Sequence, residues 1–132
     1  MILVDSNVLI DVMTDDPVWG DWSEASLEAA SLVGSLLTSD VVYAELAVRY
    51  EQIEALDAFL AEAQIEVVPL PKAALFLAGK VFGRYRRAGG TKSGVLPDFF
   101  IGAHASVAGW PLLTRDVRRY RTYFPALDLI TP

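Results

Sequence analysis

The sequence predicts an α/β fold in which a mostly parallel sheet of about four or five strands is covered by helices on both faces. Two observations lead to this prediction. Short apolar runs of strand length recur along the chain, and longer stretches with helical periodicity lie between them. Strands that alternate with helices form parallel sheets. The chain has 132 residues and no internal repeat or linker-like segment, so residues 1–132 are expected to form a single domain.

The expected strands and helices follow one another regularly. The apolar runs typical of strands are residues 2–4, 36–38, 67–68, 112–114 and 127–130. The stretches expected to be helical are residues 6–14, 21–33, 39–45, 51–63, 72–88, 96–107 and 116–120. Ser6 and Ser39 are the expected N-caps of the helices that they begin. Gly34 and the Gly89-Gly90 pair are expected to end the helices before them.

The composition restricts the chemistry. With no cysteine, the chain has no disulfide, thiolate metal site or cysteine nucleophile. The single histidine, His104, excludes a multi-histidine zinc site, and we expect it to be a hydrogen-bonded core residue. A bound metal must therefore take oxygen ligands, which favours Mg²⁺, Mn²⁺ or Ca²⁺. No apolar stretch approaches the ~18–20 residues of a membrane span, and we expect a cytoplasmic protein.

The net charge of −6 is unevenly distributed. Residues 1–66 carry fourteen acids and one base, whereas residues 67–132 carry three acids and ten bases. The first half therefore has a charge of −13 and the second half +7. A strongly basic half can hold a phosphate backbone although the whole chain is acidic. The alternative is that these cations lie on ordinary solvated helix faces.

Four carboxylates fall where such a sheet places its functional sites. Asp5 directly follows the first strand, and Asp116 follows the strand at residues 112–114. Glu45 lies in the helix after the second strand, and Asp98 in the first turn of an apolar helix. Sites in parallel α/β folds form at the carboxyl ends of the strands. Four acids at that edge are typical of a site for a hard divalent cation.

Ordinary structural roles are the alternative for three of these acids. Asp5 could cap the helix that follows it. Asp98 and Asp116 could each begin a helix, where the helix dipole favours an anion.

Glu45 is the hardest of the four to explain without a metal, because it lies too far into its helix to be a cap. Its neighbours Val41, Val42 and Val48 place it on an expected core-facing side, where a carboxylate needs a partner. A salt bridge to Arg49, at position i+4, is the alternative to a metal.

Four segments in this order resemble the signature blocks of PIN domains, and more narrowly those of the VapC toxins of type II toxin–antitoxin systems. The segments are Val4–Ile10, Val41–Leu46, Leu96–Ala105 and Leu112–Asp116. The resemblance covers essentially the whole chain. It implies a Mg²⁺- or Mn²⁺-dependent endoribonuclease that cleaves RNA phosphodiester bonds, forms homodimers and is inhibited by a cognate VapB-like antitoxin.

The resemblance also assigns roles to residues. Asp5, Glu45 and Asp98 are the expected metal ligands and catalytic residues, and Asp116 is a further ligand. Asn7 and Thr114 are expected to orient the carboxylates through hydrogen bonds or to touch the phosphate.

Five cations are candidates for RNA binding. They are Lys80, Arg84, Arg87, Lys92 and Arg115. The first three recur at i, i+4 and i+7 and so share one face of a helix. The basic, glycine-rich segment 84–94 precedes Asp98 and could hold RNA near the metal, or could simply be a helix end and a connector.

Three other functions are alternatives to a toxin nuclease. The segment Ile2–Val8 also resembles the start of haloacid-dehalogenase-type phosphatases, but Asn7 stands where those enzymes need an acid. A non-toxin PIN nuclease in RNA processing, or a binding module with an inactive metal site, would share the same fold.

Overall fold

The computed structural model describes residues 1–92 and 96–132, which form a five-stranded parallel sheet with the strand order β3-β2-β1-β4-β5. The strands are β1 (Ile2–Val4), β2 (Leu36–Ser39), β3 (Ile65–Val68), β4 (Leu112–Leu113) and β5 (Leu129–Ile130). All four pairings are parallel. The predicted α/β fold class is therefore confirmed.

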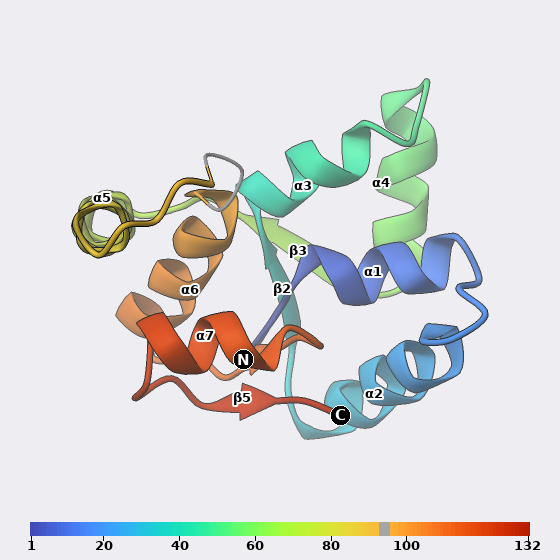
Figure 1. Cartoon of the computed structure of the whole chain (residues 1–132). Helices are drawn as coiled ribbons and strands as arrows, with labels where there is room; N and C mark the ends of the chain where they lie inside the picture. The colour runs from blue at the N-terminus through green and yellow to red at the C-terminus, as the bar shows by residue number, and fades with distance from the viewer. Residues whose placement is uncertain (93–95) are drawn as a thin grey trace.

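Helices lie on both sides of this sheet, as Figure 1 shows. They are α1 (Ser6–Met13), α2 (Gly20–Val33), α3 (Asp40–Ala47), α4 (Ile53–Glu62), α5 (Lys72–Arg87), α6 (Leu96–Ala108) and α7 (Val117–Tyr123). Seen along the sheet, α1, α2 and α4 lie to one side of the strands, and α5 and α6 lie to the other. No helix within the described residues is long and apolar enough to cross a membrane.

The central strand β1 is buried on both faces. Leu3 pairs with Leu37 of β2 on one side and with Leu112 of β4 on the other, and Leu3 and Val4 are fully buried. A strand between two helical layers must present apolar side chains to both, which explains its continuous apolar run.

The order in which strands are added to the sheet reverses at β1, and this reversal determines where the site lies. From β1 the chain passes through α1 and α2 to β2 on one side, while β4 lies on the other side of β1. A crevice opens at the carboxyl ends of strands at such a switch point. Asp5 directly follows β1, and Asp116 lies three residues after the end of β4, so both acids stand at this crevice.

The predicted cap of α1 was wrong. Asp5, not Ser6, is the N-cap: it has an extended backbone, and its Oδ1 accepts a hydrogen bond from the Ser6 N–H at 2.7 Å. Ser6 is the first helical residue. The predicted cap of α3 is confirmed, because the Ser39 hydroxyl accepts from the Val41 N–H at 3.4 Å.

Most predicted helix bounds agree with the structure to within a few residues. The basic segment 84–94 is only partly described, since Ser93 and Gly94 lie outside the described residues.

Candidate active site

Asp5 is the most enclosed carboxylate of the chain's predicted site. Its side chain is buried, and its Oδ2 accepts hydrogen bonds from the Thr114 hydroxyl at 2.8 Å and the Tyr120 hydroxyl at 3.0 Å. The Asn7 amide donates to the same oxygen at 3.3 Å. Burial raises the pKa of Asp5 to about 6, and these hydrogen bonds only partly oppose the effect. Nearby Asp98 raises it further.

Thr114 connects Asp5 to the other elements of the crevice. While its hydroxyl donates to Asp5, its oxygen accepts from the Asn7 amide at 3.2 Å and from the Asp116 backbone N–H at 3.1 Å. The Asn7 carbonyl oxygen accepts from the Arg115 N–H at 3.3 Å. The structure therefore brings Asn7 and Thr114 against Asp5, in positions suited to orienting its carboxylate.

Glu45 lies half-buried on α3, facing Asp5 and Asp98. Burial and the repulsion of these two acids raise the pKa of Glu45 to about 7. Its Oε1 is buried and has no hydrogen-bond partner in residues 1–92 and 96–132. A buried carboxylate oxygen without a donor is costly unless a cation or a proton compensates it.

The predicted surroundings of Glu45 need one correction. Val42 is fully buried, but Val48 is 86% exposed because α3 ends at Ala47 and Val48 is its C-cap. The alternative salt bridge between Glu45 and Arg49 is not found in the part of the chain that the structure describes.

Asp98 and Asp116 share a cation that the sequence analysis missed. The Arg119 Nη1 contacts the Asp98 Oδ2 and lies 3.7 Å from the Asp116 Oδ2. Burial raises the pKa of Asp98, and the positive charge of Arg119 opposes this. The i, i+3 spacing of Asp116 and Arg119 was a signal for their pairing, but nothing in the sequence indicated the contact with Asp98.

Tyr120 is a second residue that the sequence analysis missed. It is completely buried under the crevice, and its hydroxyl donates to Asp5. Burial and the nearby acids raise the pKa of Tyr120 well above its usual value, so the phenol stays a proton donor. A buried tyrosine usually needs a polar partner, but its position in the sequence does not identify that partner.

The residues of the crevice are of the type that binds a hard divalent cation, but they are not yet arranged as a binding site. Asp5, Glu45 and Asp98 supply only oxygen donors, and the Glu45 Oε1 has no partner in the described chain. Within residues 1–92 and 96–132, however, no three acidic or histidine side chains are already arranged to hold a metal ion. One of the three, Asp98, is held by Arg119. The donor set therefore fits the metal, provided that Asp98 leaves its arginine.

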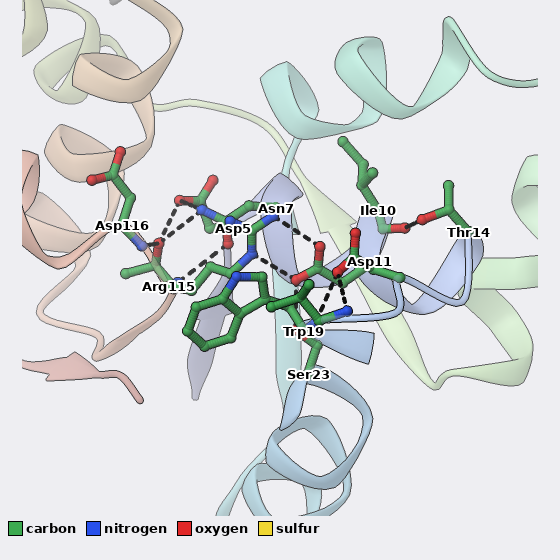
Figure 2. Close-up of polar contacts among 12 residues, drawn as sticks. Asp5, Asn7, Ile10, Asp11, Thr14, Trp19, Ser23, Arg115 and Asp116 are labelled. Carbon is green, nitrogen blue, oxygen red and sulfur yellow. Dashed lines mark hydrogen bonds and ion pairs between the residues drawn. The ribbon is translucent and has the colours of Figure 1, made fainter. Parts of the chain in front are cut away.

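A second polar cluster stands beside the crevice, as Figure 2 shows. Arg115 donates two hydrogen bonds to buried Asp11, from Nε at 2.7 Å and from Nη2 at 2.9 Å. Ser23 donates to the same carboxylate at 2.8 Å, and the Arg115 guanidinium lies 5.6 Å from the centre of the Trp19 ring. Although burial alone would raise the pKa of Asp11, these donors hold it below its usual value. Arg115, predicted to bind RNA, is thus already engaged by an internal carboxylate.

A polar hollow of about 460 Å³ adjoins Asp116. It is lined by residues of α7 and of the end of α5 and its following turn: Tyr85, Lys92, Asp116, Arg118, Arg119, Thr122 and Tyr123. Of the predicted RNA-binding residues, Lys92 lies in this hollow. Lys80, Arg84 and Arg87 lie along α5, and the Lys80 ammonium stands 5.0 Å from the centre of the Phe76 ring.

His104 is buried, as predicted, but its expected hydrogen bonding is wrong at one atom. The Nδ1 has no partner within the described residues. Its ring packs at 5.6 Å from that of Trp110, and burial lowers the pKa of His104. Burial disfavours the charged form, so a neutral imidazole is favoured although Asp40 acts in the opposite direction.

Comparison with known proteins gives one family and several similar folds. The family model described as "PIN domain" matches residues 2–125. A comparison with curated protein sequences found no significant match.

The similar solved structures resemble nearly the whole chain. VapBC2 from Rickettsia felis bound to a promoter DNA fragment has a TM-score of 0.76 and 20% identity, covering 100% of this chain and 99% of that one. VapBC-1 from nontypeable Haemophilus influenzae has a TM-score of 0.73 and 22% identity, covering 99% and 98%. A toxin–antitoxin complex from Klebsiella pneumoniae has a TM-score of 0.71 and 20% identity, covering 100% and 98%. At these identities the likeness shows the fold alone.

Proposed function

Since the chain belongs to the PIN-domain family, we propose that it is a divalent-metal-dependent endoribonuclease that acts as the toxin of a type II toxin–antitoxin pair. The observation that carries the nuclease proposal is the state of Asp5 and Glu45. Asp5 directly follows β1, and Glu45 lies on the helix that follows β2; their pKa values are raised to about 6 and about 7, and the Glu45 Oε1 is buried without a partner in the described chain. Such perturbed groups at a crevice are typical of a catalytic site.

Asp5, Glu45 and Asp98 would hold Mg²⁺ or Mn²⁺, and Asp116 would complete the set. When bound, the metal would activate water and neutralise negative charge on the phosphodiester. Thr114, Tyr120 and Asn7 fix the Asp5 carboxylate through their hydrogen bonds, so that its orientation does not depend on the metal. The Ser6 N–H donates to the other oxygen of Asp5, Oδ1, and fixes its position in the same way.

The hollow beside Asp116 is the best place for the RNA next to the cleaved bond. Lys92 and Arg118 can contact phosphates, and the rings of Tyr85 and Tyr123 lie edge to face at 5.7 Å at its wall. Cations beside aromatic rings are typical of surfaces that bind single-stranded nucleic acid. Lys80, Arg84 and Arg87 on α5 would extend this contact along the RNA.

Cleavage of RNA tests the nuclease proposal. We expect wild-type protein with Mg²⁺ to cut single-stranded RNA, and EDTA to stop it. Asp5→Asn and Glu45→Gln should each lower kcat by at least about 100-fold, because each removes a charge from the metal-binding set. The control is Asp21→Asn, which removes the same charge from an exposed position on α2. Equal cleavage by wild type, Asp5→Asn and the EDTA sample would refute the proposal.

The toxin role and the partner are inferred from the family and from the kind of complexes that share the fold. The similar structures are described as VapBC proteins or as a toxin–antitoxin complex. We propose a VapB-like antitoxin as the partner and a homodimer as the active form. Induced expression of the chain alone should arrest growth, and co-expression with the neighbouring gene should restore it. Growth unaffected in both cases, with RNA cleavage intact, would favour a nuclease of RNA processing instead.

A further inference from the structure

Arg119 holds an unusual place among the acids of the crevice. One guanidinium nitrogen, Nη1, contacts the Asp98 Oδ2 and lies 3.7 Å from the Asp116 Oδ2. These carboxylates come from different elements, since Asp98 is in the first turn of α6 and Asp116 is the N-cap of α7. The side chain of Arg119 is 28% exposed and that of Asp98 is 23% exposed, so the pair lies at the mouth of the crevice.

The negative charge of these acids is therefore opposed by a positive charge only near Asp98 and Asp116. Arg119 opposes the rise that burial causes in the pKa of Asp98. Asp5 and Glu45 lie close enough to each other and to Asp98 to repel, and the Glu45 Oε1 has no hydrogen-bond partner in the described residues. The positive charge of the arginine stands at the Asp98–Asp116 side, and the negative charge that remains lies at the Asp5–Glu45 side.

A divalent cation bound by Asp98 together with Asp5 or Glu45 would share with Arg119 a carboxylate that already has one of its two oxygens in contact with the guanidinium. Two cations this close to one carboxylate repel each other, and the repulsion is stronger in a partly buried site than in water. We infer that Arg119 is a built-in counter-ion that competes with the divalent metal for Asp98 and Asp116, so that metal binding requires displacement of its guanidinium. This inference rests on the proposed metal-dependent function.

A hollow next to Arg119 can accommodate the side chain when it leaves the carboxylates. Arg119 also lines the polar hollow that adjoins Asp116, together with Lys92 and Arg118. The competition then sets how much metal the site requires, because Arg119 offsets part of the negative charge of the acids in the metal-free protein.

The test is the affinity for Mn²⁺ alone, measured on the full chain from the free Mn²⁺ signal in electron paramagnetic resonance. Arg119→Met removes the competing charge and keeps a long side chain. We expect it to bind Mn²⁺ about three- to tenfold more tightly than wild type, the range that a partly exposed ion pair can contribute. Arg119→Lys should fall between the two, because an ammonium keeps the charge without the guanidinium geometry.

Arg121→Met is the matched control. It removes the same charge from an exposed position on the same helix, so its Mn²⁺ affinity should stay within about twofold of wild type. Thermal unfolding provides a second measurement in case Arg119→Met is less stable: the rise in Tm on adding Mn²⁺ should be larger in this variant than in wild type. The Mn²⁺ concentration for half-maximal RNA cleavage should fall in parallel.

The outcomes separate this inference from the proposed function. Equal or weaker Mn²⁺ binding by Arg119→Met, with wild type cleaving RNA in Mn²⁺, overturns the counter-ion role and leaves the nuclease intact. Tighter binding by Arg119→Met and Arg121→Met alike also overturns it, because the effect would then be one of net charge. Absence of Mn²⁺ binding in wild type and Arg119→Met overturns both proposals.

Discussion

Glu45 and Asp5 are carboxylates whose burial is unfavourable for folding but useful for a metal-binding site. Glu45 has a buried oxygen without a partner in the described chain, and burial, Asp5 and Asp98 together raise its pKa to about 7. Asp5 is more deeply buried, and its pKa is raised from 3.8 to about 6 although Thr114, Tyr120 and Asn7 donate to it. The donors that the fold supplies therefore offset only part of the cost of burying the charged carboxylate.

Glu45→Gln should therefore stabilise the metal-free protein at high pH. The pKa of Glu45 is about 7 in the fold and 4.5 in its ordinary state, so its favourable contribution is complete below pH 4.5 and is lost as the pH rises through 7. Glutamine stays neutral throughout. In EDTA at pH 8, we expect the Tm of Glu45→Gln to exceed that of wild type by about 3–6 °C, which corresponds to about 1 kcal/mol.

The difference between Glu45→Gln and wild type should shrink towards zero as the pH falls to about 4.5, where both side chains are neutral. Glu51→Gln, at an exposed position, is the control and should change the Tm little at either pH. A constant difference in Tm across this range would show that Glu45 ionises normally in the fold.

At the scale of elements, the apolar periodicity of the chain predicted its helices and strands well but did not predict their local surroundings. The strands at β1 and β2 and the buried helix α6 follow from continuous apolar runs, because both faces of these elements are covered. The cap of α1 depended on whether Asp5 or Ser6 has the extended backbone, and sequence preference favours both types of residue. The exposure of Val48 depended on where α3 ends, which periodicity leaves open.

The contact between α6 and the segment after α7 gives a prediction for Gly102. A Cβ built at Gly102 would lie 2.5 Å from the buried Phe124 ring, and both residues are enclosed in the core. Gly102→Ala should lower the free energy of unfolding by about 1–3 kcal/mol, because the buried Phe124 ring or the helix would have to shift to make room for the methyl group. Urea unfolding monitored by circular dichroism measures this change.

Gly79→Ala is the control for Gly102→Ala, since it makes the same change within α5. No atom lies within 4 Å of a Cβ at that position, and alanine favours a helix over glycine by about 0.8–1 kcal/mol. We therefore expect Gly79→Ala to be neutral or stabilising. A Gly102→Ala protein as stable as Gly79→Ala would mean that α6 and Phe124 are not packed as the structure places them.

At the scale of the whole molecule, the two halves of the sequence occupy different sides of the fold. The acidic first half includes α1, α2 and α4 on one side of the strands, and the basic second half includes α5 and α6 on the other side (Figure 1). The sequence predicted this asymmetry and also the arrival of Asp5 and Asp116 at one edge. It did not predict the pairing of Arg115 with Asp11, of Arg119 with Asp98 or of Tyr120 with Asp5. These contacts join segments far apart in the chain, so the pairing of each donor with its acid depends on the tertiary structure.

The separation of charge predicts that RNA binding depends on salt although the protein is acidic overall. With EDTA present to prevent cleavage, the affinity for single-stranded RNA should fall as salt rises, with a slope of about −0.7 in log K against log salt for each phosphate contacted. Arg118 lines the hollow beside Asp116, so Arg118→Gln should reduce that slope by about 0.7. Fluorescence anisotropy of labelled RNA at several salt concentrations measures both quantities.

Lys72→Gln is the control for Arg118→Gln, because Lys72 is an exposed cation at the other end of α5. Both variants lose one positive charge, so any general effect of net charge affects them equally. If RNA follows the hollow, Arg118→Gln reduces the slope and Lys72→Gln leaves it unchanged. Equal slopes for both variants and wild type would place the RNA elsewhere, and equal reductions would mean that RNA responds to the total charge of the basic half rather than to a defined path beside Asp116.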